Sequence, residues 1–210
     1  MFSGGSCGGF SPPVVGGCVG TFCKNHLMRK LIIMAAFLSS LGRLFGGDDK
    51  PAYELAEIYT GMRQQVLELD AEKIGELKDK PVWAVLMETG YPETAVTLVA
   101  VADGAASLYF SNGGGIIGAG EHANVRPASL RLVTMAEGFL PQMKKVEKSP
   151  VPKPGMTCFY VVTPKGIFTY TAKEDDLGEE RDKLSKLFHQ GHELIGQMRI
   201  AEQKRQAEQE

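Results

Sequence analysis

Three short apolar runs, 82–87, 94–102 and 106–110, follow one another with only brief turns between them, and this order limits the fold more than any other feature. The first two, VWAVLM and TAVTLVAVA, are rich in β-branched residues, which favour strands. Asp103-Gly104 separates the second run from the third and is typical of a tight hairpin. Because such a hairpin joins its strands antiparallel, the sequence predicts a three-stranded antiparallel meander.

Helical patterns stand before the meander, after it and near the end of the chain. Apolar residues recur at three- and four-residue steps over about 50–70, 124–143 and 175–201, which predicts one helix in each range. The pair Asp48-Asp49 would cap the first helix, and Asn124 stands where the second should begin. The expected buried faces are Leu55, Ile58, Tyr59, Met62, Val66 and Leu69 in the first helix, Leu130, Val133, Ala136, Leu140 and Met143 in the second, and Leu184, Leu187, Phe188, Gly191, Leu194, Ile195 and Met198 in the third.

A second hairpin is expected between the last two helices. Residues 157–163 and 167–171 are strand-like and flank the turn Pro164-Lys165-Gly166. Residues 144–155, KKVEKSPVPKPG, are typical of a stiff, extended connector. The order α-βββ-α-ββ-α therefore predicts a single α+β domain, with an antiparallel sheet of about five strands and helices packed against it.

Charge divides the chain into a leader and a body. Residues 1–47 are glycine-rich and contain four basic and no acidic residues, whereas residues 48–210 contain 19 basic and 25 acidic ones. We expect a disordered leader or a misplaced start codon over 1–47, an α+β domain over 48–201, and a charged tail over 202–210. The net charge of −2 and the absence of a basic stripe with aromatic residues argue against a nucleic-acid partner.

The leader contains a short apolar segment, Leu31–Phe45. Its uncharged part, residues 31–42, is 12 residues long, and a membrane span needs about 20, so we expect at most peripheral contact with a membrane. If translation starts at Met28, the segment resembles an export signal. If it starts at Met34, the segment is only a short amphipathic opening, and we favour a cytoplasmic protein.

Cysteines are unevenly distributed. Cys7, Cys18 and Cys23 lie in the leader and, with His26, supply four possible zinc ligands, but their spacing matches no finger or ribbon. Cys158 lies alone in the apolar run CFYVV of the body, where a small buried thiol is expected. A reducing compartment suits this distribution best.

The densest glycine cluster of the body follows the third predicted strand, with five glycines between Gly113 and Gly120. Residues 113–118 satisfy the pattern G-x-G-x-x-G. A dinucleotide fingerprint also requires a parallel strand before the glycines and a helix that begins within them. Here the preceding strands are predicted to be antiparallel and the helix begins near Asn124, so we do not expect a dinucleotide cofactor, nor any other.

Two interpretations of this segment stay open. In the first, backbone amides, a helix N-terminus and the Arg126 guanidinium bind a phosphate or carboxylate, and Glu121 or His122 transfers a proton. The ligand-binding residues would be Ser111, Asn112, Gly113, Gly114, Gly115 and Arg126. In the second, the glycines only form a bulged turn or a tight crossover, and Ser111-Asn112 shapes the turn.

A metal site on the last helix is a weaker possibility. His189 and His192 are three residues apart and share a helix face, with His122 as a possible third ligand. At about 100° per residue, however, His189 and Glu193 fall away from the apolar stripe, which favours a solvated helix surface. We expect no metal.

Few residues suggest catalysis. No G-x-S-x-G motif is present, and Cys158 lies in mid-strand rather than at a helix N-terminus. Glu88 could meet the glycine-rich segment across the sheet, or could be a carboxylate at the sheet edge, and Trp83 is expected in the core.

The sequence therefore predicts a non-enzymatic, cytoplasmic α+β module that binds a protein or small-molecule partner. A homodimer could form through the sheet edge or the last helix. The alternative is a small enzyme or sensor that binds an anionic ligand at residues 111–126.

Overall fold

The computed structural model describes residues 53–70 and 77–208. The possible zinc ligands Cys7, Cys18, Cys23 and His26, the apolar segment Leu31–Phe45 and the alternative start codons all lie outside the described residues.

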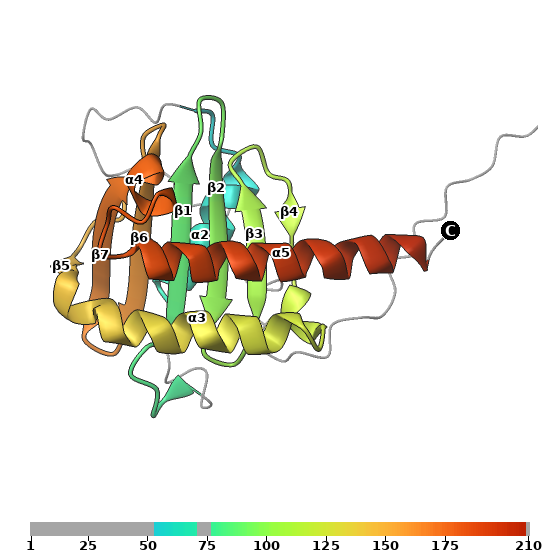
Figure 1. The fold of residues 1–210 in the computed structure, drawn as a ribbon, viewed down its shortest axis with the longest axis horizontal. Helices are drawn as coiled ribbons and strands as arrows, with labels where there is room; N and C mark the ends of the chain where they lie inside the picture. Colours follow the sequence, from blue (N-terminus) through green and yellow to red (C-terminus); the bar gives the residue numbers. More distant parts are fainter. Residues whose placement is uncertain (1–52, 71–76, 209–210) are drawn as a thin grey trace, which may run out of the picture.

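A mixed α+β architecture is built around one antiparallel sheet (Figure 1). Over the described residues, the sheet has seven strands in the order β4-β3-β2-β1-β6-β7-β5. They are β1 (Ala84–Gly90), β2 (Ala95–Val101), β3 (Ala106–Phe110), β4 (Gly115–Ile116), β5 (Lys144–Val146), β6 (Met156–Thr163) and β7 (Gly166–Lys173).

The prediction of about five strands is wrong by the two edge strands. β4 has two residues and β5 has three, which is too short to show an alternating pattern in the sequence. Each exists because a neighbour pairs with it: β3 pairs with β4, and β7 pairs with β5. The start of the predicted connector 144–155 is therefore a strand.

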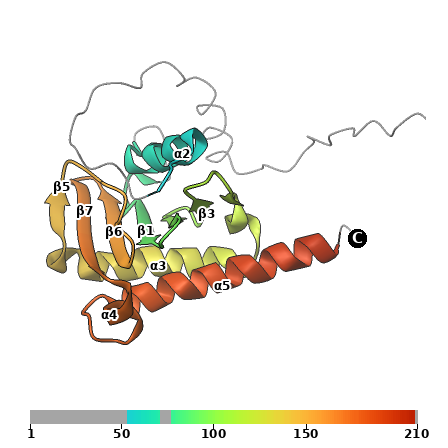
Figure 2. The same ribbon diagram turned by 90° about the horizontal axis from the view of Figure 1, so that it is seen from above.

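Helices cover both faces of the sheet (Figures 1 and 2). They are α2 (Glu57–Leu67), α3 (Val125–Phe139), α4 (Glu174–Gly178) and α5 (Ser185–Ala207), with short 3₁₀ turns η2 (Ala119–Glu121) and η3 (Leu140–Gln142). α3 and α5 cross one face, and α2 lies against the other.

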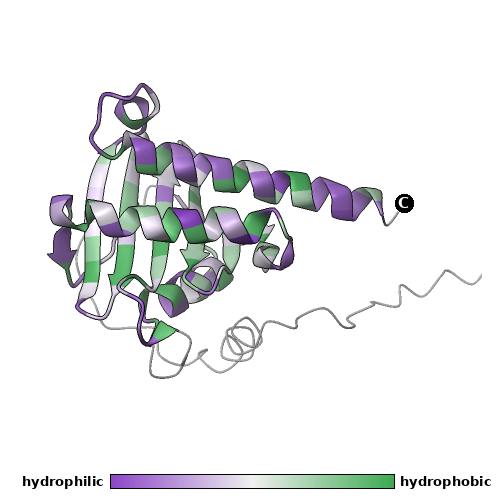
Figure 3. Cartoon of the chain, turned by 60° about the horizontal axis from the view of Figure 1, so that its bottom comes forward, coloured by the Kyte–Doolittle hydropathy of each residue, from purple (hydrophilic) through white to green (hydrophobic). Residues whose placement is uncertain are grey.

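The face beneath α3 and α5 is apolar. The predicted stripe of α5 is buried at Leu187, Leu194 and Met198, as expected. Gly191 allows α5 to approach β1 closely, because an added Cβ would lie 2.6 Å from the Met87 sulfur. Figure 3 shows hydrophilic residues along the outer surfaces of the two helices, so burial is confined to their inner faces.

Two predicted helices differ from those observed. Residues 54–56 are not helical and α2 begins at Glu57, so the start predicted near residue 50 is wrong. Ile58, which was expected on the buried face, is 56% exposed, whereas Arg63 is buried. Leu130 of α3 is likewise exposed rather than buried.

The predicted helix 175–201 is divided into α4 and α5. Glu180 adopts a φ of 60°, the left-handed conformation that ends a helix. The Asp182 carboxylate then accepts a hydrogen bond from the Leu184 amide at 2.8 Å, and the Ser185 hydroxyl accepts one from the Asp182 amide at 3.3 Å. These two bonds stabilise the turn that precedes α5.

Candidate functional site

The first half of the glycine-rich segment is a hairpin turn between β3 and β4. The Phe110 amide donates to the Gly114 carbonyl, and the Gly113 amide donates to the Phe110 carbonyl, both at 2.9 Å. The Gly114 amide donates to the Asn112 side-chain oxygen at 3.1 Å, as in an Asx turn. Gly113 has a φ of 94°, which favours glycine.

Ser111 ties this turn to its surroundings. Its hydroxyl accepts a hydrogen bond from the Ala95 amide at 3.1 Å and lies 2.9 Å from the Thr94 hydroxyl. Its carbonyl accepts a bond from the Ala56 amide at 2.8 Å. Ser111 is buried, and these contacts join β2, β3 and the segment before α2.

The second half of the segment crosses closely over the β2–β3 hairpin. Gly118 has a φ of 76° and precedes η2. A Cβ added to Gly120 would overlap the Gly104 carbonyl and lie 2.7 Å from the Ala105 Cα. Only glycine permits this approach of two backbones.

The start of α3 bonds mainly to its own chain. The Val125 and Arg126 amides both donate to the His122 carbonyl, at 3.0 and 3.2 Å, and Pro127 has no amide hydrogen. The side chain of Asn124 does not cap α3 but donates to Gln197 of α5. These amides are those that an anion at the helix N-terminus would need.

The predicted ligand residues fall into two groups. Arg126 packs beside Gly104, where an added Cβ would lie 2.6 Å from the Arg126 Cγ. Ser111 lies at the other end of β3, and five residues of strand span roughly 17 Å. His122 and the exposed Glu121 lie with Arg126 near the start of α3, and the 112–115 turn lies with Ser111. The structure does not bring the two groups of residues together. An anion site that combines all of them stays a prediction.

The histidines also divide. His122 interacts electrostatically with Glu202 on α5, and ten residues of helix, about 15 Å, separate Glu202 from His192. His189 is exposed, with Nε2 3.9 Å from a Glu180 carboxylate oxygen. The His192 ring packs edge-on against Phe188 at 4.3 Å, and desolvation there lowers its pKa. Within 53–70 and 77–208, no cluster of three or more His, Cys, Asp or Glu side chains could hold a metal ion.

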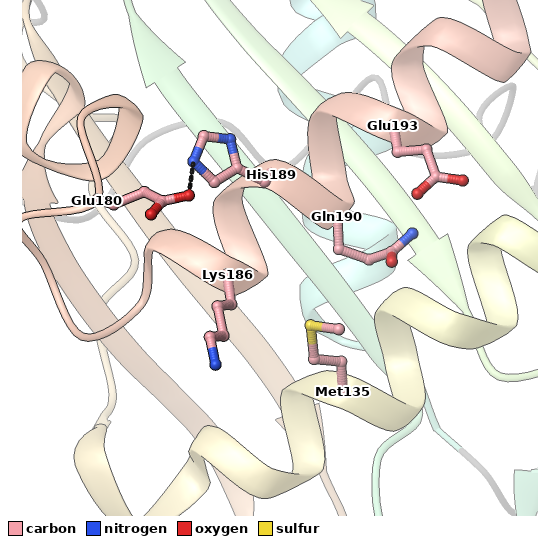
Figure 4. Close-up of a pocket in the computed structure, with 6 residues that line it drawn as sticks. All are labelled: Met135, Glu180, Lys186, His189, Gln190 and Glu193. Atoms are coloured by element: carbon pink, nitrogen blue, oxygen red, sulfur yellow. Dashed lines mark ion pairs between the residues drawn. The ribbon is translucent and has the colours of Figure 1, made fainter.

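A shallow depression of about 420 Å³ lies between α3 and α5 (Figure 4). Its lining residues are Met135, Glu180, Lys186, His189, Gln190 and Glu193. Most of these residues are exposed, and they include both acidic and basic side chains. The depression belongs to the outer surface of the helices rather than to an enclosed site.

The most distinctive chemistry lies on the other face, beneath α2, where the sheet buries an ion pair. The Arg63 Nε and Nη2 atoms of α2 donate to the two carboxylate oxygens of Glu88 on β1, at 2.7 and 2.8 Å. Glu88 is completely buried. The Thr97 hydroxyl also donates to Glu88 at 3.2 Å, and Tyr59 is hydrogen-bonded to Thr97 at 2.9 Å. The Arg63 guanidinium lies 5.5 Å from the centre of the Tyr160 ring.

We call Tyr59, Arg63, Glu88, Thr97 and Tyr160 the Arg63–Glu88 cluster. Glu88 was expected either to meet the glycine-rich segment or to lie at the sheet edge, and both expectations are wrong. β1 lies in the interior of the sheet between β2 and β6, and the Glu88 carboxylate bonds to Arg63. The predicted site residues do not include Arg63. A signal exists in the sequence, since Arg63 follows Tyr59 by four residues and precedes Val66 by three, on the apolar face.

No family model matches this chain, and neither a curated protein nor a solved structure matches it.

Burial tunes the groups around the cluster. It raises the pKa of Tyr59 to about 12, and the nearby Glu88 charge adds to this effect. Burial alone would lower the pKa of Arg63, but the charge and hydrogen bonds of Glu88 outweigh it and raise that pKa. Burial also raises the pKa of Cys158, whose thiol lies 3.1 Å from the Thr171 hydroxyl. The thiol is therefore held protonated, which disfavours nucleophilic chemistry.

None of the helices that the structure describes combines the length and apolar character needed to cross a membrane.

Proposed function

We propose that the protein is a non-enzymatic binding module that acts in the cytoplasm and takes up an extended partner strand along the β4 edge of its sheet. The observation that carries this proposal is the character of that edge. Residues 111–120, SNGGGIIGAG, contain neither a charged residue nor a proline. Charged residues and prolines are among the features by which natural edge strands avoid pairing with another chain.

Backbone geometry at β4 supports strand addition. The Phe110 amide donates to the Gly114 carbonyl, so the next pair, Tyr109 and Gly115, takes the position of the ladder at which the two residues are not bonded to each other. The amide and carbonyl of Gly115 consequently point away from β3. Ile117 follows and is 48% exposed, so the edge offers a backbone donor and acceptor beside an apolar residue, as peptide-adding sheets do.

Three reactive groups of the core support binding over catalysis. In the described part of the chain, Glu88, Cys158 and Tyr160 are buried and are each hydrogen-bonded to other residues of the protein. Cys158 is a free, buried thiol, which suits a reducing compartment such as the cytoplasm.

The simplest occupant of the edge is β4 of a second copy. Two neutral edges related by a twofold axis meet without like-charge contacts, and the two sheets become continuous. The test is sedimentation equilibrium at low and high protein concentration. Ile117→Lys places a charge at the edge and should keep the protein monomeric, whereas wild type and the matched control Ile200→Lys, changed at an exposed isoleucine of α5, should dimerise.

A wild-type protein that stays monomeric throughout would contradict the dimer. The anionic-ligand alternative is tested separately, by thermal melting with phosphates, nucleotides and carboxylates. We expect no shift in Tm, because the amides of Gly113, Gly114 and the start of α3 bond to their own chain. A shift that is lost in Gly115→Ala and His122→Ala would overturn the proposal in favour of an anion site.

A further inference from the structure

The proline-alternating residues 149–154, SPVPKP, lie against the Arg63–Glu88 cluster, and we call them the proline strap. The Arg63 Nη2 atom donates to the Ser149 carbonyl at 2.7 Å, and the Tyr160 hydroxyl donates to the Pro150 carbonyl at 2.6 Å. The Tyr53 hydroxyl donates to the Pro152 carbonyl. Three side chains from separate parts of the chain thus hold three strap carbonyls.

The sequence of the strap favours an extended, polyproline-like backbone. Pro150, Pro152 and Pro154 have fixed φ and no amide hydrogen, and each residue between them precedes a proline and is restricted to extended backbone. In a helix of three residues per turn, the Ser149 and Pro152 carbonyls share a face. The strap therefore presents acceptors to the three donors and few competing donors of its own.

The strap also fits closely on the sheet. Gly90, the last residue of β1, pairs with Pro154 in a parallel bridge, and its carbonyl accepts a bond from the Gly155 amide at 2.8 Å. A Cβ added to Gly90 would lie 2.7 Å from the Lys153 carbonyl carbon. Pro152 is buried and Val151 packs against the core. The strap is therefore packed tightly against the end of β1 and the core.

We propose that Tyr53, Arg63 and Tyr160 form a binding groove for extended, proline-rich peptides, and that the strap is an internal ligand which blocks it. Tyrosine hydroxyls and rings commonly line grooves that recognise such peptides. A tethered ligand has a local concentration in the millimolar range, so an external peptide binds only when the strap is loosened. The strap is then an autoinhibitory contact.

The test uses a labelled peptide of residues 148–155, KSPVPKPG, and fluorescence anisotropy with the full chain. In Pro150→Gly/Pro152→Gly the strap loses its preference for the extended form, and this variant should bind the peptide at least about tenfold more tightly than wild type. Adding Tyr160→Phe to this variant should weaken binding about threefold to tenfold, because one of the three donors to the strap carbonyls is lost. The matched control Tyr170→Phe, changed at a tyrosine that bonds instead to Asp182, should leave binding intact.

A folded Pro150→Gly/Pro152→Gly protein that does not bind the peptide would overturn the proposal, as would binding unaffected by Tyr160→Phe. If circular dichroism shows that the double variant is unfolded, Pro150→Ala is titrated instead, because the Pro150 side chain is exposed and its carbonyl is retained. Failure of that folded variant to bind more tightly than wild type is equally decisive. Ile117→Lys should change none of these results.

Discussion

Single residues in this protein owe their roles to partners far away in the sequence. Arg63 and Glu88 are 25 residues apart, yet their side chains form two hydrogen bonds in a buried environment. The pair fixes how α2 sits on β1, because a guanidinium and a carboxylate bond well in few orientations. Glu88 ends the apolar run at the start of β1, and the sequence shows this carboxylate but not the partner that satisfies it.

Breaking this pair should be costly. Arg63→Met leaves the Glu88 carboxylate buried without its cationic partner, and Glu88→Leu leaves the Arg63 guanidinium buried without its anionic partner. Each single variant should therefore lower the free energy of unfolding by about 3–5 kcal/mol. The double variant Arg63→Met/Glu88→Leu leaves no buried charge and should recover much of that loss. Urea unfolding of the four proteins measures this. A double variant that loses the sum of the two single effects would contradict the interpretation.

At the scale of elements, glycine has different roles in the helices and in the crossover. Gly120 lies where η2 crosses the β2–β3 hairpin, against the backbone of Gly104 and Ala105. Gly61 lies in the middle of α2 with open space around its Cα. The sequence places both residues correctly in local context, but the close approach at Gly120 depends on how two distant segments meet.

Alanine substitutions should therefore act in opposite directions. Gly120→Ala forces two backbones apart and should lower the free energy of unfolding by roughly 1–3 kcal/mol. Gly61→Ala improves helix propensity at an open position and should raise it by up to about 1 kcal/mol. Thermal and urea unfolding of both variants would show the difference in sign. Equal effects would mean that the crossover yields easily.

At the scale of the whole molecule, the sheet and its helices place every tyrosine in a setting that disfavours ionisation. The chain has six tyrosines, and burial raises the pKa of all six: Tyr53, Tyr59, Tyr91, Tyr109, Tyr160 and Tyr170. For Tyr59, Tyr91 and Tyr170 the raised value is about 12, against an ordinary value of 10.0.

The protein should consequently lose stability in alkali. As the pH rises above 10.0, tyrosines of the unfolded chain release protons while those of the folded protein keep them until about pH 12. The folded state then binds more protons than the unfolded state, so the free energy of unfolding falls with rising pH. Absorbance of tyrosinate should stay low past pH 10.0 and appear together with unfolding followed by circular dichroism. Tyrosinate that appears at the ordinary pKa in folded protein would contradict this.

Local sequence patterns determined much of the architecture. The runs rich in β-branched residues predict β1, β2, β3, β6 and β7, joined as antiparallel hairpins. The apolar stripe of α5 lies buried as expected. These features follow from period-two and period-3.6 spacing, which depends only on neighbouring residues. The same patterns predict one continuous helix across Glu180. Apolar spacing carries no information on a single residue in the left-handed conformation, so it does not show the break.

Only the tertiary structure decided the edge strands, the ion pair and the position of the proline strap. β4 exists because β3 pairs with it, and the strap is held by donors that lie about 10 to nearly 100 residues away in the chain. The sequence by itself determined the five longer strands, the turns of their hairpins and the approximate positions of the main helices. The strand register and the position of α2 on the sheet decided which polar groups form hydrogen bonds with each other. The reason is that a buried donor or acceptor bonds to whatever partner the fold brings within reach.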